Sequence, residues 1–174
     1  MTQYIIICDI DNCFTDSREW VKYAPLDVDE KDKSVFRERW DRFHSLSFLA
    51  KPNKSVIDFL LSISELTPIY FVTSREDRKE ARKDTENQIS KFSNGKIVIG
   101  DKHKLFMRKE FDYRASAVIK EEIVREILDN DCIPVLAIDD DKSNCEMFCK
   151  LGIPTKLYNI ETDTFEKYLV PEAV

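Results

Sequence analysis

The stretch that decides the fold is Tyr4-Ile5-Ile6-Ile7-Cys8-Asp9-Ile10-Asp11. It begins as a short apolar run rich in β-branched residues, which is typical of a strand buried on both faces. Two aspartates then follow at alternate positions. Because ligands of parallel sheets bind beyond the carboxyl ends of the strands, this stretch predicts a polar site at the end of a central strand.

Strand and helix patterns alternate along most of the remaining chain. Further strands are expected at residues 69–72, 96–99, 133–138 and 155–158, and helices at 56–64, 76–92, 115–130 and 141–151. This alternation predicts an α/β fold, a Rossmann-like doubly wound parallel sheet with helices on both faces. No segment resembles a linker or a repeat, so we expect a single domain over residues 1–174.

Residues 18 to about 51 do not fit the alternation and form an insertion after the first strand. Phe36, Trp40 and Phe43 are spaced i, i+4, i+7, which gives a helix in this insertion an aromatic face. That face either packs on the domain or belongs to a small helical cap that roofs the site, and the two interpretations are compatible.

The composition limits the class of protein. The chain has 174 residues, of which 43% are hydrophobic and 34% charged, and a formal charge of −6. Domains built mainly to grip nucleic acid are usually basic, so this chain would need a local basic patch or a small ligand. No apolar run approaches the roughly 20 residues of a membrane span, and no basic leader precedes the first strand, so we expect a cytoplasmic protein without membrane contact.

Cysteine and histidine usage argues against disulfides and zinc. The chain has five cysteines, two histidines and no CxxC pair. An odd number of cysteines in an expected cytoplasmic protein does not indicate a disulfide framework. We therefore interpret the cysteines as small, mostly buried side chains.

Acidic and hydroxyl side chains follow three of the expected strands. Asp9 and Asp11 follow the first, Thr73 ends the second, and Asp139 and Asp140 follow the strand at 133–138. Carboxylates gathered at one sheet edge repel one another unless a cation lies among them. Mg²⁺ suits such a site, because it binds one or two carboxylates together with substrate phosphate.

Lys120 lies beside an apolar stripe on the helix expected at 115–130. Its ammonium group either extends to solvent or points at the acidic site, and the pattern does not separate these readings. Other phosphate chemistries have no support, since the chain contains no GxxxxGK[ST] segment and no glycine-containing cysteine–arginine loop.

These residues resemble the haloacid dehalogenase superfamily of phosphotransferases. Its first motif, DxDx[TV], is matched by residues 9–13 except that Cys13 stands at the last position. Thr73 matches the second motif, Lys120 the third, and the pair Asp139-Asp140 the fourth. The resemblance implies a fold of this superfamily with a cap insertion, and it favours a functional Lys120.

A closer resemblance is to the 3′-phosphatase domain of bacteriophage polynucleotide kinase-phosphatase. It is carried by residues 73–76, 107–123 and 137–140, and is weakest over 18–51. It implies that Arg75 and Arg108 contact phosphate, and it places Ser74 and Arg114 beside them as substrate-binding residues.

The resemblance also implies a division of roles. Asp9 is the covalent nucleophile, and Asp11 is the acid and then the base, which requires a raised pKa at Asp11 and an ionised Asp9. Thr73 and Lys120 hold the phosphoryl oxygens. Mg²⁺ is held by Asp9, the backbone carbonyl of Asp11 and Asp140, with Asp139 as a close partner.

Three functions follow from these observations. The first is a polynucleotide 3′-phosphatase in nucleic-acid end repair, and the second is a mononucleotide phosphatase. The third is a non-catalytic binding module on the same fold. Basic residues over 102–114 (Lys102, Lys104, Arg108, Lys109 and Arg114) are expected to lead a nucleic-acid end toward the site, while those over 75–83 belong mostly to a solvated helix face. The sequence leaves the oligomeric state open.

Overall fold

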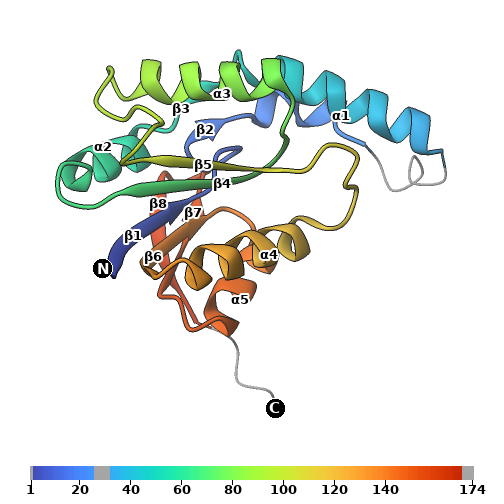
Figure 1. Ribbon diagram of the computed structural model, residues 1–174. Coiled ribbons are helices and arrows are strands. Elements are labelled where there is room, and N and C mark those ends of the chain that lie inside the picture. Colours follow the sequence, from blue (N-terminus) through green and yellow to red (C-terminus); the bar gives the residue numbers. More distant parts are fainter. Residues whose placement is uncertain (1, 26–31, 170–174) are drawn as a thin grey trace.

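A six-stranded sheet forms the centre of the computed structural model, which describes residues 2–25 and 32–169 (Figure 1). The strand order is β5-β4-β1-β6-β7-β8. The strands are β1 (Gln3–Cys8), β4 (Ile69–Glu76), β5 (Lys104–Arg108), β6 (Cys132–Asp139), β7 (Thr155–Asn159) and β8 (Thr164–Tyr168). All neighbours pair in parallel except β7 and β8, which are antiparallel. The predicted α/β class and parallel sheet are confirmed.

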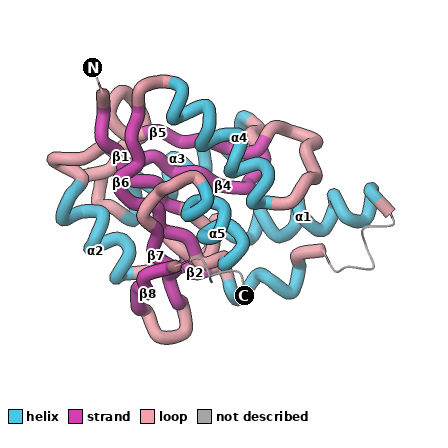
Figure 2. The backbone as a smooth tube through the Cα atoms, turned by 90° about the horizontal axis from the view of Figure 1, so that it is seen from below, coloured by secondary structure: helices cyan, strands magenta, loops and turns pink. Residues whose placement is uncertain are grey.

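Helices cover both faces of the sheet. One face packs against α2 (Lys54–Ile63) and α3 (Lys79–Phe92), and the other against α4 (Ser116–Asp129) and α5 (Lys142–Lys150). Figure 1 shows α3 above the sheet and α4 and α5 below it. The tube view of Figure 2, seen from below, shows α4 and α5 lying across the strands of the sheet.

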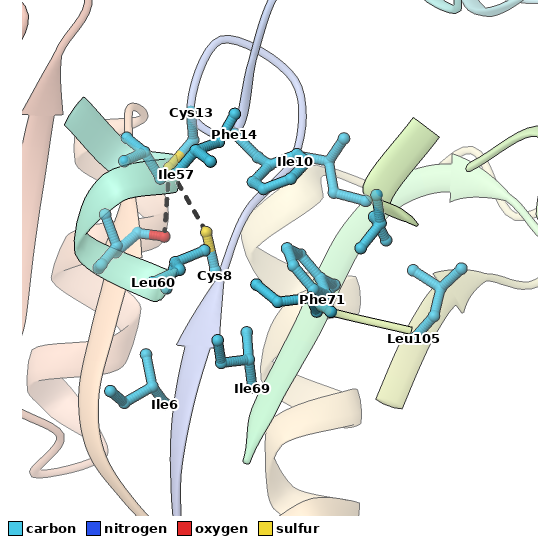
Figure 3. Packing of buried hydrophobic residues seen from close by; sticks show 14 of the residues in the cluster. Ile6, Cys8, Ile10, Cys13, Phe14, Ile57, Leu60, Ile69, Phe71 and Leu105 are labelled. Carbon is cyan, nitrogen blue, oxygen red and sulfur yellow. Dashed lines mark hydrogen bonds between the residues drawn. The ribbon is translucent and has the colours of Figure 1, made fainter. Parts of the chain in front are cut away.

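Residues of β1 alternate between the two cores that the helices create. Ile6 and Cys8 belong to the core under α2 and α3, and Ile5 and Ile7 to the core under α4 and α5. Figure 3 shows the first of these cores, with side chains from β1, β4, β5 and α2 gathered in it. The run is apolar without interruption because water reaches neither face of a central parallel strand.

The prediction of a strand at residues 96–99 is wrong. The strand that pairs with β4 is β5, at Lys104–Arg108, and Ile99 forms only an isolated bridge with His103. Ile97 is buried in the core and Ile99 only partly, whereas Leu105 and Met107 are both buried there from β5. Strand β8 was not predicted, and it returns antiparallel beside β7.

The observed position of β5 changes which of the basic residues over 102–114 can lie near the site. Because β5 is parallel to β4, its carboxyl end at Arg108 meets the site edge, and Lys104 lies at the opposite end. Lys102 precedes that opposite end and donates to the backbone carbonyl of Glu65. These two lysines therefore do not lead toward the site, contrary to the prediction.

The predicted insertion begins and ends at a small pair of strands. Strands β2 (Thr15–Asp16) and β3 (Lys51–Pro52) are antiparallel partners. Between them lie the 3₁₀ helix η1 (Arg18–Tyr23) and the helix α1 (Lys33–Ser47), which we call the cap. Residues 26–31 of the predicted insertion lie outside the described residues. Figures 1 and 2 both show α1 beside the end of the sheet where β1 and β4 finish.

No helix in the described part of the chain is long and apolar enough to cross a membrane.

Truncation of a core leucine tests this packing. Leu60 of α2 is 0% exposed, whereas Leu66 in the following turn is 88% exposed. We expect Leu60→Ala to lower the free energy of unfolding by about 2–5 kcal/mol, because it removes buried methyl groups and leaves a cavity. Leu66→Ala, the same chemical change at the surface, should alter it by less than about 0.5 kcal/mol in urea titrations. Equal effects of the two substitutions would contradict the described core.

Candidate active site

A buried lysine joins the ends of two strands at the centre of the sheet. Asp9 follows β1 and Asp139 ends β6, and Lys120 reaches both from α4. The Nζ atom of Lys120 lies 2.5 Å from Oδ1 of Asp9 and 2.7 Å from Oδ2 of Asp139. Burial opposes the charge on Lys120, but the two carboxylates outweigh it and raise its pKa. The functional reading of Lys120 thus has a structural basis: its ammonium group lies inside the acidic site.

Asp9, Asp139 and Asp140 form an acidic cluster around this lysine. Carboxylate oxygens from these three residues lie within 4.8 Å of one another. Burial raises the pKa of Asp9 to about 7, although Lys120 lowers it, and burial together with Asp9 raises the pKa of Asp140 to about 8. One ammonium group therefore does not neutralise the cluster, which favours a further cation.

The two adjacent aspartates differ in how their oxygens are used. Asp139 is fully buried, and its Oδ1 accepts hydrogen bonds from Nδ2 of Asn144 and from the backbone N–H of Asp141, both at 3.0 Å. Asp140 lines the cavity, and among the described residues no other side chain donates a hydrogen bond to its carboxylate. The buried Oδ1 atom of Asn144 has no hydrogen-bond partner among the described residues. The acidic cluster fits a hard cation such as Mg²⁺, because ligands about 2.0–2.1 Å from one ion lie within the 4.8 Å that separates these carboxylate oxygens.

Asp11 lies apart from the acidic cluster although it is only two residues from Asp9. Arg75 binds it through two hydrogen bonds, Nε to Oδ2 at 2.8 Å and Nη2 to Oδ1 at 2.7 Å. Ser17, which the sequence did not single out, donates to Oδ1 at 2.9 Å. Burial raises the pKa of Asp11, but the Arg75 guanidinium outweighs burial and lowers it below its usual range.

The expected order of the two pKa values is therefore reversed in this structure. The sequence predicts a raised pKa at Asp11 and an ionised Asp9, whereas the pKa of Asp11 is lowered and that of Asp9 is raised. The physical reason is the placement of the cations. Arg75 forms a two-bond ion pair with Asp11, while Asp9 shares a single lysine with Asp139.

Arg75 holds Asp11 rather than lining the cavity over Asp9. Its side chain is fully buried, and Nη1 donates to Oγ1 of Thr85 at 3.2 Å and to Oε1 of Gln88 at 3.0 Å. Its guanidinium also lies over the ring of Phe48 at 5.2 Å. The arginine thus connects Asp11 to α3 and to the end of the cap, which is a positioning role that the sequence did not predict.

Arg108 is the buried arginine that does line the cavity. It is 9% exposed, and its Nη1 donates to the backbone carbonyls of Asp112 and Arg114. Its Nε is buried without a partner, and it forms no ion pair with any described residue. Burial lowers its pKa. A buried guanidinium without a carboxylate partner is suited to an anion, as the sequence predicts for this residue.

The other predicted substrate-binding residues surround the same cavity. Thr73 is buried within β4, where the pairing with β5 becomes irregular, and Ser74 is hydrogen-bonded to Ser116 with the two Oγ atoms 2.6 Å apart. Arg114 also lines the cavity, but it forms ion pairs with Asp112 and Glu122, both at 2.6 Å. Its charge is therefore already neutralised, so Arg114 offers less to a phosphate than the sequence predicted.

The cavity has a volume of about 480 Å³ and joins the strand ends to the cap. Its floor carries Asp9, Thr73 and Lys120. Its other side, which we call the aromatic roof, consists of four aromatic side chains: Phe36, Trp40, Phe43 and Tyr113. The aromatic face of the cap helix thus lies over the strand ends, as the cap interpretation predicts.

Ion pairs connect the cap to the sheet beside this roof. Arg78, just before α3, binds Asp41 of α1 at 2.8 Å and lies 3.5 Å from Glu110. Arg37 of α1 lies 3.6 Å from Glu110, and its guanidinium is 4.3 Å from the centre of the Phe111 ring. The sequence shows the charges but not which of them pair across more than thirty residues.

The family model of the polynucleotide kinase PNKP phosphatase domain matches residues 3–162. The chain belongs to this family. It is accordingly a phosphatase of the haloacid dehalogenase superfamily, as the motifs predict. A search of curated proteins finds no match.

Solved structures of low sequence identity share the fold. A chain of the Pnkp1/Rnl/Hen1 complex superimposes with a TM-score of 0.66 at 20% identity, over 90% of this chain and 45% of that one. A chain of the Pnkp1/Rnl/Hen1 RNA repair complex gives 0.63 at 18% identity, over 90% and 42%. A haloacid dehalogenase-like family hydrolase from Streptococcus pneumoniae gives 0.58 at 15% identity, over 88% and 83%. The present chain spans less than half the length of the two chains from the Pnkp1 complexes.

A double-mutant cycle tests the pairing of Arg75 with Asp11. We expect Arg75→Ala to lower the free energy of unfolding by about 3–5 kcal/mol, because it leaves a largely buried carboxylate unpaired. The coupling with Asp11→Asn should be about 1–3 kcal/mol at neutral pH. Because the pKa of Asp11 is lowered in the folded state, the coupling should be complete above its ordinary value of 3.8 and shrink as the pH falls below it.

Arg82 and Asp77 provide the matched control, since they form a two-bond pair of the same kind at the surface, with side chains 34% and 39% exposed. Their coupling should be below about 1 kcal/mol. Similar couplings for the two pairs would contradict the buried role of Arg75.

Proposed function

We propose that this phosphatase is a Mg²⁺-dependent phosphomonoesterase that acts through an aspartyl-phosphate on Asp9 and removes 3′-phosphates from nucleic-acid ends. The observation that carries the proposal is the cavity floor, where Asp9 is held by buried Lys120 beside unneutralised carboxylates. The family match to the PNKP phosphatase domain supports the substrate class.

The free oxygens of the acidic cluster identify the proposed metal ligands. Asp9 and Asp140 would hold Mg²⁺ through their carboxylates and Asp11 through its backbone carbonyl, while both oxygens of Asp139 are already bonded. Bound Mg²⁺ supplies positive charge that stabilises the negative charge developing on phosphoryl oxygens.

The protein groups supply the nucleophile and its orientation. Asp9 attacks phosphorus with one carboxylate oxygen while Lys120 fixes the other by its 2.5 Å contact with Oδ1. The bond from phosphorus to the sugar oxygen breaks, and the phosphoryl group passes to Asp9. Carboxylates of this kind are established covalent nucleophiles.

Asp11 moves the proton in both halves of the reaction. It first protonates the leaving sugar oxygen, and as a carboxylate it then accepts a proton from the water that attacks the aspartyl-phosphate. The lowered pKa suits the second role. A substrate phosphate brings negative charge beside Asp11, which raises its pKa toward the range that the first role requires.

Hydroxyl and cationic groups would hold the phosphoryl group. Thr73 and Lys120 lie on the cavity floor, and Arg108 brings a buried guanidinium with an unpartnered Nε. Each such preorganised contact contributes on the order of 3 kcal/mol to transition-state stabilisation.

A mononucleotide phosphatase is the second candidate, because the cavity of about 480 Å³ is closed over by the cap and the chain is acidic overall. A non-catalytic binding module is disfavoured by the assembled floor of Asp9, Thr73, Lys120 and Asp140.

A substrate panel with an Asp9→Asn variant tests the chemistry and the substrate together. We expect the wild type to release phosphate faster from 3′-phosphorylated oligonucleotides than from 5′-phosphorylated ones or free nucleoside monophosphates. Asp9→Asn should lose at least about 10³-fold in kcat, because an amide is a poor nucleophile. Asp129→Asn, an exposed acid at the end of α4, is the control and should keep full activity. Preferred turnover of free monophosphates would favour the second candidate, and full activity of Asp9→Asn would exclude the proposed nucleophile.

Metal removal tests the acidic cluster. Chelation with EDTA should abolish phosphate release, and added Mg²⁺ should restore it, because the three carboxylates exceed the charge of Lys120. Asp140→Asn should raise the Mg²⁺ concentration needed for half-maximal activity by at least about tenfold. Turnover that is insensitive to chelation would contradict the metal assignment.

A further inference from the structure

The cavity is chemically divided, and the catalytic groups occupy only one part of it. The floor carries both negative and positive charge, on Asp9 and Lys120, and under the proposed function it receives the phosphate group. The aromatic roof presents no charge, and three of its members come from one face of α1. Tyr113 is the fourth and belongs to the loop before α4.

The roof keeps accessible aromatic surface. Phe43 is 5% exposed and belongs to the packed base of the cap. Phe36, Trp40 and Tyr113 are only half-buried, and all three line the cavity. Aromatic side chains at i, i+4, i+7 of a helix would ordinarily be covered by the domain beneath. Here an uncovered part of that face borders the catalytic floor.

Neighbouring rings fix the positions of these side chains. The ring centres of Phe36 and Trp40 are 6.2 Å apart with an interplanar angle of 79°, and those of Phe36 and Tyr113 are 5.9 Å apart at 81°. Trp40 is also stacked on His44 at 5.4 Å and 22°. Edge-to-face and stacked contacts of this kind are favourable, so the roof is held in place before any ligand arrives.

We infer that the aromatic roof binds the nucleobase of the terminal nucleotide whose 3′-phosphate reaches Asp9. The inference rests on the proposed function, because it takes the occupant of the floor to be a nucleotide phosphate. The occupant of the roof must be flat, largely apolar and joined to that phosphate by a short linker. A nucleobase meets all three conditions, and every base has a π-face that an aromatic side chain can stack on.

The ion pairs of the arginines near the cavity favour recognition of the nucleobase over recognition of the phosphate backbone. Arg75 is bound to Asp11, Arg78 to Asp41, and Arg114 to Asp112 and Glu122. Arg108 is buried at the floor. Apart from Arg108, these arginines are therefore engaged by carboxylates, which leaves stacking as a source of recognition beyond the terminal phosphate.

Oligonucleotides with and without a terminal base test the inference. The substrates are single-stranded 3′-phosphorylated oligonucleotides that end either in a normal nucleotide or in an abasic sugar of the same charge. We expect wild-type kcat/KM to be roughly tenfold or more higher with the base present, and similar for different bases, since stacking tolerates any sequence. Trp40→Ala and Phe36→Ala should bring kcat/KM for the base-bearing substrate down to the abasic level through a higher KM.

Tyr23 supplies the matched control, because it is a cap aromatic that lines a different cavity and contacts Arg42 instead. Tyr23→Ala should retain the preference for a terminal base. Thermal unfolding of each variant checks that the cap substitutions leave the fold intact. A preference that survives Trp40→Ala and Phe36→Ala in folded protein would overturn the roof assignment.

A binding measurement separates this inference from the proposed function. The chain has two tryptophans, so Trp20→Phe leaves Trp40 as the sole indole reporter. In an Asp9→Asn, Trp20→Phe variant, base-bearing oligonucleotides should quench Trp40 fluorescence and abasic ones should not. Quenching without wild-type turnover of either substrate would refute the proposed function and support the roof. Equal turnover of both substrates without quenching would refute the roof and leave the phosphatase proposal standing. Faster, Trp40-dependent turnover of a phosphotyrosyl peptide would overturn the nucleobase as occupant.

Discussion

The site depends on one buried interaction, the contact of the Lys120 ammonium group with both Asp9 and Asp139. It joins α4 to the ends of β1 and β6, so the lysine fixes the geometry of the sheet edge as well as its charge. Burying several carboxylates together is unfavourable without compensating charge and hydrogen bonds. Lys120 compensates only part of the negative charge, and the remainder makes the cluster suited to a cation.

A second ion pair gives two neighbouring aspartates different surroundings. Asp9 and Asp11 lie at alternate positions, yet Arg75 takes Asp11 out of the cluster and connects it to α3 and Phe48. The proposed nucleophile and acid/base group would need distinct environments, and this arrangement gives Asp9 and Asp11 different surroundings within three residues of chain. The same arginine contacts Phe48 at the end of the cap, so one side chain packs against both the cap and Asp11.

The sequence predicted those features that depend on local pattern. A continuous apolar run identified β1 as a central strand, and parallel topology then brought Asp9, Thr73 and Asp139 to one edge. Features decided by distant partners were not predictable. Both 96–99 and 104–108 have strand-like segments, and only pairing with β4 selects the second. The partner of Arg75 lies 64 residues away, and no spacing rule indicates that Asp11 rather than a phosphate is beside it.

The distribution of paired charges bears on how an acidic protein can act on nucleic acid. Proteins that track along a strand expose unpaired lysine and arginine side chains to the phosphates. In this structure Arg78, Arg82 and Arg114 are each held by carboxylates, whereas the arginine with an unpartnered, buried nitrogen next to the catalytic floor is Arg108. Under the proposed function, this pairing would concentrate affinity on the group that enters the cavity and not on the strand behind it. An enzyme that acts on strand ends needs that distribution, because internal phosphates, which vastly outnumber terminal ones, would otherwise compete for the site.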